Sequence, residues 1–234
     1  MVGIGREFWS RRAFALAFVL MASIAGLGAQ SAGTGISVFL PRSLLQGNGG
    51  SPAFEQSLGT ELGLGSLLRI PFGIDYYQVD GMGIEFPSGD FVSAAAMPAF
   101  YGDSLQAYAG LGLRLGVGKV FMGIEGGGIG SWSFRLSAID GALESALPAG
   151  SSISQLTLTK NFGYGWFAGA KFGVVFGKLS FDLGATWRDV RQPLGLDVKW
   201  IDYSSGTAVA KTTSSSATLV LQGLSCRLGG SFSF

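Results

Sequence analysis

The sequence predicts an all-β fold, a closed antiparallel eight-stranded transmembrane β-barrel preceded by a cleavable signal peptide. Three observations predict it. Of 234 residues, 47% are hydrophobic and only 13% are charged, whereas about 25% are charged in ordinary soluble domains. Apolar residues recur at every second position over long stretches. Short and long connections alternate along the chain, as in outer-membrane barrels.

The N-terminal segment 1–29 is predicted to be an export signal. Three arginines precede an apolar run at 13–25, and small residues follow it. This order is typical of a signal peptide, and cleavage is expected after Ala29 or Ala32. A membrane anchor is the alternative interpretation. After this segment no apolar run reaches the 18 to 20 residues that a membrane helix needs.

Residue usage excludes several classes of chemistry. The chain has no histidine, and Cys226 is its only cysteine. Neither His-dependent catalysis nor a thiolate metal cluster is therefore expected, and the sequence predicts no enzyme, no cofactor and no metal site. A formal net charge of +1 gives no indication of nucleic-acid binding.

Two hairpins carry the clearest alternation. Apolar residues take the odd positions from Leu105 to Val117, and Gly118–Lys119 follows as a tight turn. The return strand continues the apolar face through Met122, Ile124, Trp132, Phe134 and Leu136. The same device repeats from Leu156 to Phe176, with a turn at Gly177–Lys178 and a return that begins at Leu179.

The remaining strands complete a barrel over residues 33–234. We expect strands near 33–40, 58–64 and 217–234, and a strand that returns from a short turn at Arg69–Pro71. Four long segments join the other ends, and with both chain ends in the periplasm they are expected as extracellular loops. Their approximate ranges are 41–56, 80–103, 137–154 and 190–215. The last is expected to expose Trp200 and Tyr203.

The glycine-rich face of each strand is expected to point inward, because it has too few charges for a solvated surface. A soluble sandwich, with the faces reversed, is the alternative. We predict that a lumen ion network is formed by Glu61, Arg114, Glu125, Lys171, Asp182, Arg188 and Arg227. Within it, Arg114 is expected diagonal to Glu125, and Lys171 diagonal to Asp182. A charge-paired plug and a gated polar path both fit this pattern.

Aromatic residues fall on both faces. On the lipid face an aromatic girdle is expected near the outer interface, formed by Trp132, Phe134, Tyr164, Trp166 and Trp187. The inner face is expected to carry five aromatic rings, which either line a path for hydrophobic compounds or pack the lumen. They are Phe39, Tyr77, Tyr108, Phe121 and Phe167.

The C-terminal "RLGGSFSF" resembles the signal that the barrel assembly machinery reads, through Arg227, Gly229, Phe232 and Phe234. "GYGWFAGAKFGVVFGKLSFDLGATWRDV" (163–190) and "AYAGLGLRLG" (107–116) resemble the OmpW family, with OmpX and opacity-type barrels as neighbours. The resemblance implies an outer-membrane protein of a diderm bacterium, with membrane lipid and the assembly machinery as partners. It also implies passage or binding of small hydrophobic compounds.

An eight-stranded barrel is just wide enough to be filled by side chains or to hold one small ligand, so a general porin is not expected. The alternative to hydrophobic-solute transport is a surface barrel. Its long loops would then serve adhesion to a host surface molecule, or a structural role in the membrane.

Overall fold

The computed structural model describes residues 31–47, 51–85, 97–138, 141, 143–203 and 206–233. The predicted signal peptide and Phe234 lie outside these residues. The described elements are β1 (Ser31–Pro41), α2 (Arg42–Leu45), β2 (Ala53–Leu64), β3 (Leu68–Glu85), β4 (Met97–Val117), β5 (Val120–Ala138), the short 3-10 helix η1 (Glu144–Ala146), β6 (Ser151–Lys160), β7 (Gly163–Phe176), β8 (Leu179–Asp202) and β9 (Val209–Ser233). In these ranges no helix is long and apolar enough to cross a membrane.

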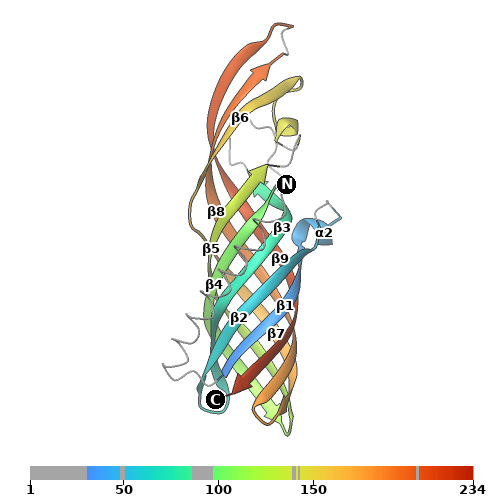
Figure 1. Ribbon diagram of the computed structural model, residues 1–234, viewed down its shortest axis with the longest axis vertical. Helices are drawn as coiled ribbons and strands as arrows, with labels where there is room; N and C mark the ends of the chain where they lie inside the picture. Colours follow the sequence, from blue (N-terminus) through green and yellow to red (C-terminus); the bar gives the residue numbers. More distant parts are fainter. Residues whose placement is uncertain are drawn as a thin grey trace, which may run out of the picture.

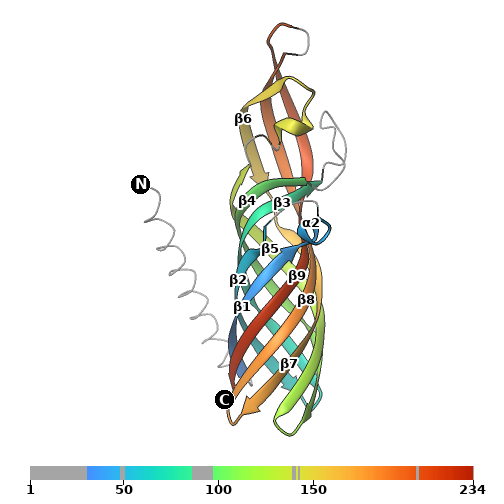
Figure 2. The ribbon, with the colours of Figure 1, turned by 90° about the vertical axis from the view of Figure 1, so that its right-hand side faces the viewer.

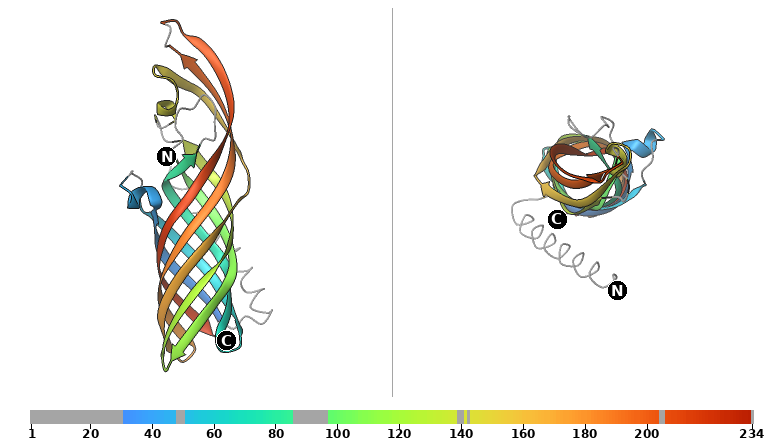
Figure 3. Two further views of the ribbon diagram at one scale, coloured as in Figure 1. Left: turned by 180° about the vertical axis from the view of Figure 1, so that it is seen from behind. Right: turned by 90° about the horizontal axis from the view of Figure 1, so that it is seen from above.

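Eight strands close into one antiparallel barrel (Figures 1 and 3). Their order around it is β1, β2, β3, β4, β5, β7, β8 and β9, and β9 pairs again with β1. The closing pair runs the full length of β1, from Ser31 opposite Ser233 to Pro41 opposite Gly223. The prediction of an all-β, eight-stranded antiparallel barrel is confirmed.

Tight turns join the strands at one end of the barrel, which we call the turn end. The first residue of β1 and the last residue of β9 also lie at this end. Gly118 and Gly177 each open a two-residue turn, with φ of 63° and 64°. Only glycine adopts such angles without a steric cost, and they match the twist of the flanking strands. The turn predicted at Arg69–Pro71 is wrong: the chain reverses at residues 65–67, because Leu64 pairs with Leu68 and β3 has already begun.

The two faces of the barrel wall differ in polarity as the alternation predicts. Leu111 and Leu183 point outward, with exposed fractions of 61% and 62%. On the same strands Gln106 and Arg188 are buried inside. A wall with an apolar outer face and a polar inner face is the reverse of a soluble sandwich.

A ninth strand, β6, lies beyond the end of the barrel that is opposite the turn end. It pairs with β8 from Lys160 opposite Leu194 to Ser151 opposite Asp202. It runs in line with β7, and the two are separated only by Asn161 and Phe162. The single strand expected from Leu156 to Phe176 is therefore interrupted. Asn161 donates its backbone N–H to the carbonyl of Pro193 at the interruption.

We call β6, with residues 194–202 of β8 and 209–217 of β9, the extension. Figure 2 shows these strands rising beyond the rest of the barrel. The loop expected near 190–215 is therefore wrong, because most of its residues belong to β8 and β9. The other expected loops are shorter than predicted: α2 and the start of β2 occupy part of 41–56, the ends of β3 and β4 part of 80–103, and η1 and the start of β6 part of 137–154.

The polarity of the wall reverses along β8. Below Arg188 the inward positions are polar and the outward positions apolar, whereas beyond it the inward Leu194, Leu196 and Val198 are buried. The outward positions of that part include exposed charged residues such as Lys199. The extension thus has the polarity of a water-soluble sheet, and its inward residues belong to an apolar core that also includes Phe39 and Tyr77.

Trp200 belongs to this core. Its exposed fraction is 2%, and its Nε1 donates a hydrogen bond to Thr213 Oγ1 at 3.1 Å. The expectation that Trp200 is exposed in a loop is therefore wrong, whereas Tyr203 is exposed. Because β8 continues its alternation of inward and outward residues through this stretch, the indole of Trp200 points inward and is buried.

A β-bulge in β5 marks the same level of the barrel. Asp103 pairs with Arg135 and Ser104 with Ser133, so Phe134 is the extra residue. The bulge leaves both Phe134 and Arg135 exposed on the outside. After it the faces exchange, and Leu136, which was expected outward, packs against the apolar core.

Candidate functional site

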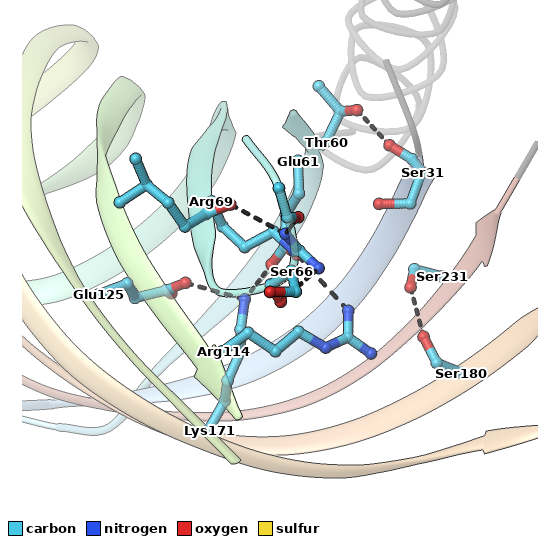
Figure 4. A network of polar contacts seen from close by, with 12 residues as sticks. Ser31, Thr60, Glu61, Ser66, Arg69, Arg114, Glu125, Lys171, Ser180 and Ser231 are labelled. Carbon is cyan, nitrogen blue, oxygen red and sulfur yellow. Dashed lines mark hydrogen bonds and ion pairs between the residues drawn. The ribbon is translucent and has the colours of Figure 1, made fainter. Parts of the chain in front are cut away.

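The lumen near the turn end holds a cluster of four charged side chains. Figure 4 shows Glu61, Arg114, Glu125 and Lys171 pointing toward one another from β2, β4, β5 and β7. Lys171 donates to a Glu61 oxygen and, at 2.9 Å, to Glu125 Oε2. Arg114 Nη1 lies 3.8 Å from Glu61 Oε2. The Lys171–Glu61 contact therefore crosses the lumen, whereas the Lys171–Glu125 contact joins the neighbouring strands β7 and β5.

The strand register places Arg114 diagonal to Glu125 and Lys171 diagonal to Asp182, as predicted, but the ion pairs that form are different. Glu125 is bonded by Lys171 rather than by Arg114, and Lys171 is bonded to Glu61 and Glu125 rather than to Asp182. Long side chains reach across the narrow lumen to strands that are not their hairpin partners. Ion pairs in such an enclosed space are screened less than surface pairs.

A second cluster lies deeper in the lumen around Arg188. Its Nη2 donates to Glu55 Oε1 at 2.8 Å, and its Nη1 lies 2.9 Å from Asp75 Oδ2. Glu55 is fully buried and also accepts a bond from Ser225 Oγ at 2.7 Å. One guanidinium thus contacts two buried carboxylates, one on β2 and one on β3.

Arg227 and Asp182 occupy the same part of the lumen, and glycines make room for them. A Cβ at Gly229 would lie 2.8 Å from both Asp182 carboxylate oxygens, and one at Gly35 would lie 2.5 Å from Arg227 Nε. Such distances are too short for real atoms. Glycine on the inner face therefore lets charged side chains lie flat against the opposite backbone.

Positive and negative charges balance inside the barrel. Five bases and five acids face the lumen or its turn-end opening: Arg69, Arg114, Lys171, Arg188 and Arg227, and Glu55, Glu61, Asp75, Glu125 and Asp182. Buried charges are tolerated when they are paired and hydrogen-bonded. The arrangement is that of a packed electrostatic plug.

Little space remains between these groups. A cavity of about 30 Å³ lies among Tyr108, Glu125, Phe167 and Arg227, room for one or two water molecules. A larger, polar opening of about 360 Å³ lies at the turn end and is lined by Ser66, Arg69 and other polar residues. Arg69 itself donates to the Gly65 and Leu68 carbonyls of its own turn.

The five predicted lumen aromatics lie inside and pack in pairs or against arginine. Phe39 and Tyr77 meet edge to face at 5.7 Å, and Tyr108 and Phe167 at 5.6 Å. The Arg114 guanidinium lies 3.7 Å from the ring centre of Phe121. Cation–π and edge-to-face contacts of this kind fill space and fix the rings.

An apolar layer closes the lumen above the charges. Phe39 and Tyr77 join Val190 and Leu221 in a core that continues without a break into the extension. From the turn end upward the barrel thus contains charged clusters, aromatic pairs and an apolar layer. Among the described residues, these three layers fill the lumen one above the other.

The expected girdle residues lie on the outer face. Four are exposed, namely Trp132, Phe134, Tyr164 and Trp166, and Trp187 is half-buried. Phe134 sits at the bulge of β5 and Trp187 next to Arg188, where the polarity of β8 reverses. The aromatic residues therefore lie at the upper edge of the apolar wall.

The residues resembling an assembly signal lie on β9, at the turn end. Arg227 faces the lumen, Gly229 makes room for it, and Phe232 is exposed on the outer face. The Lys178 ammonium lies 5.7 Å from the Phe232 ring centre. Phe234 lies outside the described residues.

Two central residues of the lumen were missed by sequence reasoning. Asp75 lies between the outward Ile74 and Tyr76, so its inward position could have been found from the alternation. Glu55 lies in a stretch that was assigned to a loop, although Phe54 and Leu58 continue the outward series. In the described residues no group of three or more Cys, Asp or Glu could hold a metal ion.

Comparison with known proteins supports the fold. No family model and no curated protein matches the sequence. The crystal structure of the outer membrane protein OprG from Pseudomonas aeruginosa is similar, with a TM-score of 0.54 at 10% sequence identity, over 88% of this chain and 97% of that chain. The chain shares its fold with OprG. At this identity the likeness concerns the fold alone, and at that level it confirms the resemblance to the OmpW family seen in the sequence.

A second structure, a major outer membrane protein from Thermus thermophilus, matches over 87% of this chain and 99% of that chain. Its identity is 11% and its TM-score 0.35.

Proposed function

We propose that this chain is an integral outer-membrane β-barrel of a diderm bacterium, with a closed lumen and an extension that stands outside the cell as a surface for recognition. The apolar wall, the aromatic residues at its upper edge and the polarity reversal of β8 support a membrane position. Outer-membrane lipid then contacts the wall, and the C-terminal strand, with Arg227, Gly229, Phe232 and Phe234, is read by the barrel assembly machinery.

The observation that carries the closed lumen is the small cavity. About 30 Å³ remains among the charged and aromatic side chains, whereas sites for small organic ligands measure about 300–1,000 Å³. The inward aromatics therefore favour packing over a path for hydrophobic compounds. The extension, in contrast, is an ordered sheet with a core, which suits contact with a host or neighbouring surface molecule.

We expect no stepwise ion conductance from the purified wild-type chain in planar bilayers. Its reconstitution should also leave the entry of an apolar fluorescent solute into liposomes unchanged, because the described charged and aromatic side chains of the lumen leave only about 30 Å³ among them. A general porin reconstituted in the same way provides the positive control. Faster entry of the apolar solute than in protein-free liposomes would favour hydrophobic transport instead.

Cysteine labelling tests the orientation. Cys226 is the only cysteine and lies exposed on the wall, so it is first replaced by serine. In that background a membrane-impermeant maleimide should label Lys199→Cys on intact cells, because Lys199 points outward on the extension. Lys119→Cys, in a tight turn, should react only after the outer membrane is permeabilised.

Leu183→Cys, on the middle of the wall, is the matched control and should resist the reagent in both conditions. Labelling of Lys119→Cys on intact cells, with Lys199→Cys protected, would reverse the proposed orientation. Ready labelling of Leu183→Cys would contradict the proposal that the apolar wall faces the membrane.

A further inference from the structure

Four basic side chains lie on the outside of the barrel, at the level where the wall changes polarity. They are Arg42, Arg135, Lys160 and Arg191, and all four residues are exposed. Arg42 follows β1, Arg191 belongs to β8, Lys160 ends β6, and Arg135 belongs to β5. Because β1, β9, β8, β7 and β5 are consecutive in the barrel, these cations follow about half its circumference. We call this set the basic belt.

Hydrogen bonds hold one half of the belt in place. Arg42 Nη1 donates to Gln222 Oε1 at 2.7 Å, and Gln222 Nε2 donates to Asp189 Oδ2 at 3.0 Å. Arg191 Nε lies 3.5 Å from Asp189 Oδ1. The two arginines are thus connected across β9 by an amide and a carboxylate.

The other half is fixed at the bulge of β5. Lys160 Nζ donates to the Phe134 carbonyl at 2.9 Å. Arg135 Nη1 lies 3.6 Å from Asp103 Oδ2. Side chains that are already held lose less conformational entropy when they bind a ligand.

The belt presents positive charge even though two carboxylates contact it. The Arg135 side chain is 43% exposed and its partner Asp103 only 6%, while Arg191 is 54% exposed and Asp189 only 15%. The acids lie beneath the bases. An approaching molecule therefore meets exposed guanidinium and ammonium groups before it meets the acids.

Apolar aromatic side chains lie directly beside the belt. Phe134 precedes Arg135, and Tyr164 pairs with Arg191 across β7 and β8. Both rings are exposed on the apolar wall. A ligand that fits both features carries anionic groups next to hydrocarbon chains.

We propose that the basic belt binds the phosphate groups of an outer-leaflet glycolipid while its acyl chains cover the adjoining aromatic residues. This inference rests on the proposed outer-membrane position. Fixed arginines suit phosphate because their planar donor sets match its oxygens. Each cation near an anionic lipid surface contributes about a fivefold gain in affinity.

Binding of fluorescent bisphosphoryl lipid A to the folded, full barrel in a zwitterionic detergent tests the belt. The wild type should bind it more tightly than the fully dephosphorylated lipid, and inorganic phosphate should compete poorly because it lacks acyl chains. Lys160→Gln with Arg191→Gln should weaken lipid A binding by roughly 25-fold. Arg42→Gln with Arg135→Gln should give a similar loss.

Lys199→Gln is the control, because Lys199 is an exposed lysine of the same strand as Arg191 but lies further out on the extension. Equal binding of the two lipids would overturn the proposal that the belt binds lipid phosphate. A loss of binding in Lys199→Gln as large as in the belt variants would also overturn it. Efficient competition by inorganic phosphate would mean a free-anion site instead and would also overturn it.

A heat-modifiable gel shift and insertion into vesicles are measured on each sample. Failure of wild-type insertion would count against the proposed membrane position, whereas normal insertion without lipid preference would count against the belt alone.

Discussion

Replacing Arg188 with alanine is expected to lower the free energy of unfolding of the barrel by about 3–5 kcal/mol, because it leaves two buried carboxylates without their counter-charge. Glu55 and Asp75 both lie within 2.9 Å of its guanidinium, and both are buried. Urea unfolding of the refolded chain in lipid vesicles, followed by tryptophan fluorescence, measures the loss.

Two further variants separate charge pairing from general damage to the lumen. Arg114→Ala should cost clearly less than Arg188→Ala, because the Arg114–Glu61 distance is 3.8 Å and Glu61 keeps Lys171 as an ion-pair partner. The triple variant Arg188→Met, Glu55→Gln, Asp75→Asn should recover most of the lost stability, since it removes the charges together. A triple variant as unstable as Arg188→Ala would show that the charges do not set the cost.

Replacing Trp200 with alanine is expected to destabilise the extension by about 3–5 kcal/mol, the usual cost of removing a buried large aromatic side chain. The indole is buried in the apolar core and hydrogen-bonded to Thr213. Because the eight strands of the barrel wall are paired with one another independently of Trp200, the loss of stability should stay confined to the extension. Limited proteolysis should cut within β8 and β9 near the tip, while the heat-modifiable shift of the barrel remains.

Tyr203→Ala is the matched control, because Tyr203 is an exposed aromatic residue close to the same tip. It should leave the protease pattern unchanged. Equal sensitivity of both variants, or resistance of both, would mean that the extension is not held by its core.

The alternation in the sequence predicts the two faces of the wall because strand periodicity is a local property. Leu111 and Leu183 could be placed outward, and Glu61 and Lys171 inward, from their own strands alone. Which charges meet could not be predicted in this way. Lys171 and Glu61 are separated by 110 residues and meet only because the closed barrel brings β7 opposite β2.

The extension was missed for a different reason. Its residues alternate as regularly as those of the wall, but the apolar set changes from the outward to the inward side. Leu194, Leu196 and Trp200 then no longer resemble a membrane strand, and the serines of β9 resemble a loop. The bulge at Phe134 is equally hidden, because one extra residue changes the side of Leu136 without any change in composition.

The continuous pairing of β8 with β9, from Leu179 opposite Phe232 to Asp202 opposite Val209, gives the tip a stiff mechanical connection to the barrel wall. At about 3.3 Å per residue, the part of β8 from Val190 to Asp202 spans about 40 Å along the strand. A flexible tether of the same length would sample many orientations, and a binding partner would have to restrict them. Here the tip is held at a set height and angle above the barrel, so a force or a bound molecule at Tyr203 acts directly on the barrel wall.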